Sequence, residues 1–208
     1  MYRAADQLIE SKTKRGKKRA PAQINSIIIH TTGYGAGLSR IAKNCKGDLD
    51  CMGKAYAYRM AKILKYKGHF LVDYVGKVWQ FLPVNEVAWH TGGRKKKSLI
   101  KKKPPKWWRD RWEGIVDRPT DLPSWQGGSP NQNSVGIDLL AHGNGQVHGI
   151  GYTDTQICNL RVLVKELCSD YAIPFDRKHV VGHEDLDWIS RNGWDPGKYF
   201  DWDDFLKG

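Results

Sequence analysis

Two short apolar runs that each end in a histidine constrain this chain most strongly. The run 27–29 (Ile-Ile-Ile) is followed by His30, and the run 180–182 (Val-Val-Gly) is followed by His183. Short apolar runs rich in β-branched residues are typical of buried strands. We therefore expect each strand to deliver one imidazole to a polar loop.

A carboxylate joins these histidines as a candidate ligand. Asp195 opens the turn sequence Asp-Pro-Gly at 195–197. Two imidazoles and one carboxylate form a three-ligand set for zinc and leave a fourth position open for water. A histidine at a strand end is more often a core or surface residue, so spacing alone leaves both interpretations open.

The order of the expected elements indicates an α/β fold. The 208 residues suit one domain with a sizeable core. The clearest helix covers 154–171, because Thr153 and Gln156 form a capping-box pattern and Pro174 follows its end. We expect strands at 24–30, 69–75, 77–82, 134–141 and 178–182, and further helices at 53–66 and 201–207. Together they predict a single domain with a central mixed β-sheet flanked by helices.

Positive charge is concentrated in two segments. The formal net charge is +12, yet residues 11–19 hold six Lys or Arg and residues 94–111 hold ten. The rest of the chain is therefore close to neutral. We treat 1–20 as a basic N-terminal extension and expect the run 11–19 to lie in solvent. By charge alone, nucleic acid, anionic lipid and anionic cell-wall polymers are all candidate partners.

A second basic segment, at about 94–132, interleaves its cations with aromatic residues. It is rich in Pro, Gly and Trp, which predicts a long loop with little regular structure. The stretch 101–112 would suit a membrane interface or stacking on rings. The alternative is a surface insertion whose tryptophans pack back on the body of the protein.

Neither a membrane span nor a cleavable secretion signal is visible. No stretch approaches eighteen apolar residues, and the first residues lack an apolar core. The delivery route of a protein acting outside the cytoplasm would therefore be unknown.

Six ordered motifs resemble a known enzyme family. They are IIIHTT at 27–32, GHFLVD at 68–73, VAWHTG at 87–92, NSVGID at 133–138, VGHED at 181–185 and DPG at 195–197. In this order, the motifs are similar to those of the zinc-dependent N-acetylmuramoyl-L-alanine amidases of the type 2 family. These enzymes are related to phage amidase lysozymes and peptidoglycan-recognition proteins. The resemblance implies an amidase-like catalytic domain over 21–208, with His30, His183 and Asp195 as zinc ligands.

The resemblance also implies roles for other residues. Asp138 stands where relatives have a Glu, so it would act as general base with a reach shorter by roughly 1.5 Å, about one carbon–carbon bond. Glu184 is the substitute candidate. Trp89, His90 and Asn133, from the matching motifs, are the expected substrate-binding residues.

Two further features follow from the comparison with this family. Many relatives carry a Lys two residues before the last ligand, where this chain has Gly193, and Arg191 or Lys198 could reach inward instead. Cys45 and Cys51 are close enough in sequence for a disulfide, and peptidoglycan-recognition proteins have a similar short cysteine loop.

The favoured hypothesis is zinc-dependent hydrolysis of the bond between N-acetylmuramic acid and L-alanine in peptidoglycan. It predicts an endolysin-like or toxin-like monomer that acts at the bacterial cell wall, with basic segments that hold anionic wall polymers or outer-membrane lipid. The alternative is a non-catalytic peptidoglycan-binding module, which the departures at Asp138 and Gly193 favour. A nucleic-acid-binding protein would show strong salt dependence and no need for zinc. That hypothesis leaves the three ligand contexts unexplained, so no dedicated nucleic-acid partner is expected.

Overall fold

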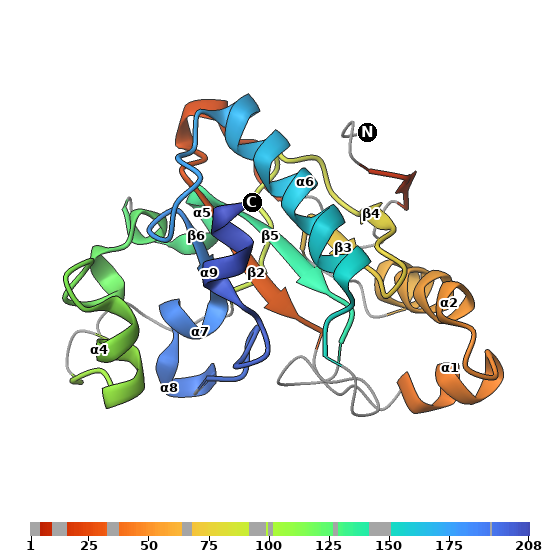
Figure 1. The fold of residues 1–208 in the computed structure, drawn as a ribbon. Helices are drawn as coiled ribbons and strands as arrows, with labels where there is room; N and C mark the ends of the chain where they lie inside the picture. The colour runs from red at the N-terminus through yellow and green to blue at the C-terminus, as the bar shows by residue number, and fades with distance from the viewer. Residues whose placement is uncertain are drawn as a thin grey trace.

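A mixed β-sheet of six strands runs through the middle of the computed structural model (Figure 1). The structure describes residues 5–9, 16–32, 38–63, 68–91, 99, 102–126, 129–141, 151–191 and 193–208. In sheet order the strands are β1 (Gln7–Leu8), β4 (Val78–Gln80), β3 (Phe70–Val72), β5 (Ser134–Leu139), β2 (Ser26–Thr31) and β6 (Val180–Gly182).

The four strands β3, β5, β2 and β6 run parallel, whereas β3 and β4 form the expected antiparallel pair. The register of β2 and β5 places His30 opposite Asp138. Parallel strands end at the same edge of a sheet, and polar sites of α/β proteins form outside their carboxyl ends. The fold thus brings the ends of β2, β5 and β6 together.

One face of the sheet packs against α6 (Asp154–Tyr171) and α9 (Trp202–Lys207), which lie across it in Figure 1. Thr153 caps α6 by accepting a hydrogen bond from the backbone N–H of Gln156, as the capping pattern predicts. Because side chains alternate along a strand, Ile27 and Ile29 meet this face. The shared core of strands and α6 fixes where β2 ends.

The opposite face is covered in two places. At β3 and β4 it packs against α2 (Leu49–Lys62), which follows α1 (Leu38–Asn44). Cys45 and Cys51 form a disulfide at the junction of these helices, which confirms the pairing suggested by the cysteine loop. Near β2 and β6 it packs against residues of the basic insertion.

The insertion departs from the expected loop. It contains α4 (Lys106–Trp112) and two short 3₁₀ helices, η2 (Pro119–Asp121) and η3 (Pro123–Trp125). Trp108 and Trp112 are fully buried and pack with Ile28 and Val181. The membrane-interface interpretation is therefore wrong for these two tryptophans, and the alternative that they pack on the body is confirmed. Burying large aromatic rings offsets the entropy of ordering the segment.

Parts of the N-terminal extension also belong to the fold. β1 adds an edge strand beside β4, and Arg19 is buried. Its guanidinium donates to the carbonyl oxygens of Val84 and Ser134. The expectation that all of 11–19 lies in solvent is thus wrong at Arg19, while residues 11–15 lie outside the described part of the chain.

Short helices complete the chain: η1 (Pro21–Gln23), α5 (Pro130–Asn133), α7 (His183–Leu186) and α8 (Trp188–Arg191). His183 therefore begins a helix instead of entering a loop. Within the described ranges, no helix has the length and apolar character that crossing a membrane requires.

Candidate metal centre

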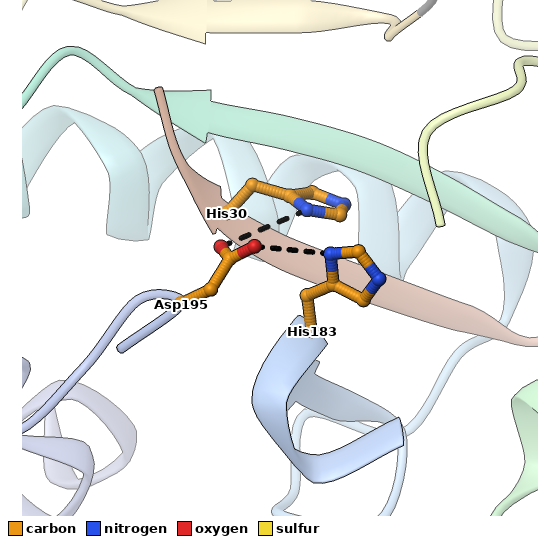
Figure 2. A group of neighbouring side chains, drawn as sticks. All are labelled: His30, His183 and Asp195. Carbon is orange, nitrogen blue, oxygen red and sulfur yellow. Dashed lines mark hydrogen bonds and ion pairs between the residues drawn. The ribbon is translucent and has the colours of Figure 1, made fainter. Parts of the chain in front are cut away.

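Three elements bring the predicted ligands together at the carboxyl edge of the sheet. His30 is the last residue but one of β2, His183 is the first residue of α7, and Asp195 lies in the turn after α8. All three are buried, and one ligand atom from each lies within 4.8 Å of the others. Figure 2 shows the carboxylate facing both rings. The sequence-based set thus converges in space.

The Asp195 carboxylate is held in place from several sides. Its Oδ2 lies 3.0 Å from His183 Nδ1, and its Oδ1 lies 3.8 Å from His30 Nδ1 (Figure 2). Oδ1 also accepts a hydrogen bond from the Thr31 backbone N–H at 2.8 Å. The turn carrying Asp195 is therefore tied to the end of β2.

The hydrogen bonds of His183 show which ring nitrogen faces the site. Its Nε2 lies 3.1 Å from the carbonyl oxygen of Thr91, which can only accept a hydrogen bond. The Arg191 Nε–H also donates to His183 Nδ1, so a neutral His183 that keeps both contacts carries its proton on Nε2 and has its lone pair on Nδ1, beside Asp195. A lone pair beside a carboxylate requires a cation between or near them.

Arg191 supplies one such cation. Its Nε donates to His183 Nδ1 at 3.2 Å and lies 3.3 Å from Asp195 Oδ2. Lys198, the other candidate for an inward cation, is exposed, with its Nζ 5.0 Å from the Tyr199 ring centroid. The donor set of nitrogen lone pairs and carboxylate suits zinc chemically.

Burial and charge also favour the protonation states in which His30 and Asp195 can bind a metal ion. Burial lowers the pKa of His30 to about 4, although Asp195 opposes the shift. Burial alone would raise the pKa of Asp195, but its contacts with the His183 and His30 rings hold it below its usual value. Near neutral pH the site thus offers a neutral imidazole and an ionised carboxylate, the states in which these side chains bind metal.

Asp138 lies beside the ligand set. It is 6% exposed, and its Oδ2 has no hydrogen-bond partner within the described residues. Burial raises its pKa well above the usual value, the charge of Asp195 adds to this, and Arg191 opposes it. A carboxyl group with a raised pKa next to a candidate metal site suits proton transfer.

Glu184 points into an ion network instead. Its Oε1 accepts from Arg111 of α4 at 2.5 Å, and its Oε2 accepts from the Asp195 backbone N–H at 3.2 Å. Arg111 also pairs with Asp185 at 3.0 Å, and Arg177 pairs with Asp185 at 2.6 Å. With both oxygens engaged, Glu184 is placed to support the Asp195 turn, whereas Asp138 Oδ2 has no hydrogen-bond partner among the described residues.

The three expected substrate-binding residues lie in different surroundings. Trp89 is 63% exposed and lines a groove of about 550 Å³ together with Asn133 and Lys17. The Asn133 side chain is nevertheless turned toward the carbonyl oxygen of Gln126. His90 is directed inward, because its Nδ1 lies 2.8 Å from His30 Nε2. Of the three side chains, Trp89 is therefore the one that is exposed to solvent in this groove.

Sequence reasoning missed two side chains that shape this region. Asn131 Oδ1 accepts hydrogen bonds from the backbone N–H groups of His90 and Thr91, at 2.9 and 3.0 Å. Arg111 reaches the site from an insertion that lacks helical periodicity. Neither residue has a local sequence signal that could have predicted these contacts.

Comparison with known proteins agrees with this site. Residues 20–198 match the family model described as N-acetylmuramoyl-L-alanine amidase. The 1,6-anhydro-N-acetylmuramyl-L-alanine amidase AmpD of Haemophilus influenzae is 23% identical over 196 residues, covering 91% of this chain and 85% of the relative.

Two solved structures share the fold. A crystal structure of a selenomethionine AmpD derivative has a TM-score of 0.55 at 22% identity, covering 100% of this chain and 95% of the other. The amidase AmiD from E. coli has a TM-score of 0.52 at 20% identity, covering 94% of this chain and 60% of the other. The match over 20–198 shows that the chain belongs to the N-acetylmuramoyl-L-alanine amidase family, enzymes that hydrolyse an amide bond of peptidoglycan.

Proposed function

We propose that this amidase depends on zinc, held by His30, His183 and Asp195, and cleaves the bond between N-acetylmuramic acid and L-alanine. The convergence of the three ligands next to Asp138 is the observation that carries the proposal. AmiD was solved with anhydro-N-acetylmuramic acid-L-Ala-D-γ-Glu-L-Lys, which supports a muropeptide as substrate here.

An amide is a poor electrophile, so its hydrolysis needs an activated nucleophile, charge stabilisation and a proton for the leaving nitrogen. A bound zinc ion would supply Lewis acidity toward the carbonyl oxygen and would acidify water. Asp138 would accept the proton of the attacking water and return it to the leaving nitrogen. Its Oδ2 is buried and has no hydrogen-bond partner in the described part of the chain, and its pKa is raised; both observations support this role.

Arg191 would stabilise the negative charge that develops on the carbonyl oxygen. It is the inward-facing cation beside the ligand set, whereas Gly193 carries no side chain and Lys198 is exposed. The Arg191 guanidinium also lies over the Trp194 ring, 4.8 Å from its centroid. That contact would keep the side chain near the site after its hydrogen bond to His183 is exchanged for substrate.

The biological role would be bacteriolytic, as an endolysin-like or toxin-like antimicrobial enzyme that acts as a monomer at the cell wall. Exposed Lys17 and Lys18 line the groove that contains Trp89. This positive charge supports binding of anionic wall polymers or outer-membrane lipid in addition to peptidoglycan.

A peptidoglycan-binding module without turnover is the second candidate. The observation that favours it is Asp138, whose side chain is shorter than the Glu of related amidases. Binding would then persist without release of muropeptides.

Digestion of purified peptidoglycan separates the two. The zinc-loaded protein should release free stem peptides that begin with L-alanine, detected by mass spectrometry, and a chelator should stop the release. Asp138→Asn should lower turnover by about 10²–10⁴-fold while elemental analysis still finds one zinc per chain. His30→Ala should lose both metal and activity. Binding without any peptide release would refute catalysis, and full activity after chelation would refute zinc dependence.

A further inference from the structure

The adjacent residues His90 and Thr91 contact both metal-ligand histidines, each through a different group. The His90 ring meets His30, and the Thr91 carbonyl oxygen meets His183. Both contacts are made at Nε2, on the side of each ring away from Asp195 Oδ1 and Oδ2. This arrangement controls where each ring carries its proton.

The proton on His30 can be traced from Ser134. The Ser134 hydroxyl donates its single hydrogen to the carbonyl oxygen of Pro130 at 2.6 Å. Its contact with His90 Nε2 at 3.2 Å must therefore be a bond in which Ser134 accepts. A neutral His90 consequently carries its proton on Nε2 and has a lone pair on Nδ1.

The tautomer of His90 in turn determines the tautomer of His30. His90 Nδ1, now an acceptor, lies 2.8 Å from His30 Nε2, which must donate to it. A neutral His30 then has its lone pair on Nδ1, the nitrogen that faces Asp195. The same nitrogen faces Asp195 in His183, because its Nε2 proton is committed to the Thr91 carbonyl oxygen.

Two neighbouring residues hold this segment in place. Asn131 Oδ1 accepts from the backbone N–H groups of both His90 and Thr91, so a single amide fixes both contacts. Gly136 of β5 leaves room for the imidazole, because a Cβ there would lie 2.5 Å from His90 Cγ and Nδ1. The His90 ring therefore lies directly against the central strand.

We propose that His90 and Thr91 are positioning residues that set the tautomers of His30 and His183, so that both present Nδ1 to one metal ion. The inference rests on the proposed zinc dependence. It gives the His90 motif a role through the ligands instead of a direct contact with substrate. Such outer partners orient a ligand ring and tune its affinity for metal.

Ring nitrogen NMR tests the assignment directly. Long-range ¹H–¹⁵N spectra of the metal-free protein should show Nε2 as the protonated nitrogen in the neutral forms of His30, His90 and His183. On addition of zinc, the Nδ1 resonances of His30 and His183 should shift strongly, whereas those of His90 should shift little. A His90 ring protonated on Nδ1, or a zinc-dependent loss of its Nε2 proton, would overturn the proposal.

Matched variants test the consequence for metal binding. His90→Phe should weaken zinc binding about 10–100-fold in chelator competition, as loss of an outer partner typically does. His90→Asn keeps an oxygen acceptor where Nδ1 was, so it should retain most of the affinity. Equal losses in the two variants would indicate a packing effect and would contradict the proposed hydrogen bond.

Two serine substitutions, compared with each other, separate the proposed hydrogen bond from a general effect on folding. Ser134→Ala removes the acceptor for His90 and should produce a mixture of His90 tautomers with weaker zinc binding. Ser124→Ala removes another buried serine hydroxyl, one without a hydrogen-bond partner in the described part of the chain, and should change neither. If the wild-type protein binds no zinc, the proposed function fails; if it binds zinc and Ser134→Ala leaves tautomers and affinity unchanged, only this inference fails.

Discussion

Replacement of Arg111 by Met should destabilise the fold by leaving a buried carboxylate without its cation. Arg111 is 26% exposed on its side chain, whereas its partners Glu184 and Asp185 are 0% exposed. Asp185 would keep Arg177 at 2.6 Å and the Trp112 indole N–H at 3.1 Å. Among the described residues, the Glu184 carboxylate would keep the Asp195 backbone N–H as its remaining hydrogen-bond partner. Loss of the Arg111 cation therefore mainly destabilises the buried Glu184 carboxylate.

The magnitude follows from how deeply the pair is buried. Removing one partner of a fully buried ion pair costs about 3–5 kcal/mol. Water can reach Arg111, so we expect a smaller loss, about 2–3 kcal/mol, which corresponds to a fall in Tm of roughly 5–10 °C for a chain of this size. Arg109→Met removes an exposed cation from the same helix and should stay within about 0.5 kcal/mol of the wild type.

Equilibrium urea unfolding in the presence of a chelator would measure this loss without a contribution from bound metal. The double variant Arg111→Met with Glu184→Gln should recover part of the stability, because the neutral amide no longer needs a cation. A double-mutant cycle then gives the coupling energy of the pair. The reasoning is refuted if Arg111→Met costs no more than Arg109→Met, or if Glu184→Gln brings no relief.

Three other changes have defined expected outcomes. Cys45→Ser with Cys51→Ser should lower the unfolding free energy by about 2 kcal/mol, the value for so short a loop, and reductant should do the same to the wild type only. Arg191→Met should tighten zinc binding roughly fivefold in chelator competition, because it removes ~1 kcal/mol of repulsion by a partly exposed cation, while kcat falls. Trp89→Ala should raise KM several-fold, through loss of an aromatic contact worth ~1 kcal/mol, without a measurable change in stability.

The sequence predicted the framework of the site because that framework is built from periodic elements. The apolar run before His30 formed β2, and the strand that ends near Asp138 formed β5 beside it. The capping pattern at Thr153 located the start of α6. In each case the signal lies within a few residues, where hydrophobic period and capping chemistry act.

The side chains that support the site from α4 were not predictable in the same way. α4 has seven residues and follows two prolines, too short a segment for a helical period to stand out. Its burial depends on Trp108 and Trp112 meeting a sheet face that the sequence does not display. Likewise, the ion pair of Arg111 and Glu184 joins residues separated by 73 positions. Contacts at such separations are set by tertiary packing.

His90 shows why a residue pattern alone does not decide between a substrate contact and a role in positioning metal ligands. A histidine within a recognisable motif near a groove suggests a substrate contact, and nothing local indicates otherwise. The proposed positioning role depends on where the two ring nitrogens point, toward Ser134 at a separation of 44 residues and toward His30 at a separation of 60. Because a neutral imidazole has one donor and one acceptor, these two contacts determine each other. A substitution at Ser134 should therefore change the tautomer of the metal ligand His30, two hydrogen bonds away. A substrate-contact role for His90 instead predicts an effect on KM alone.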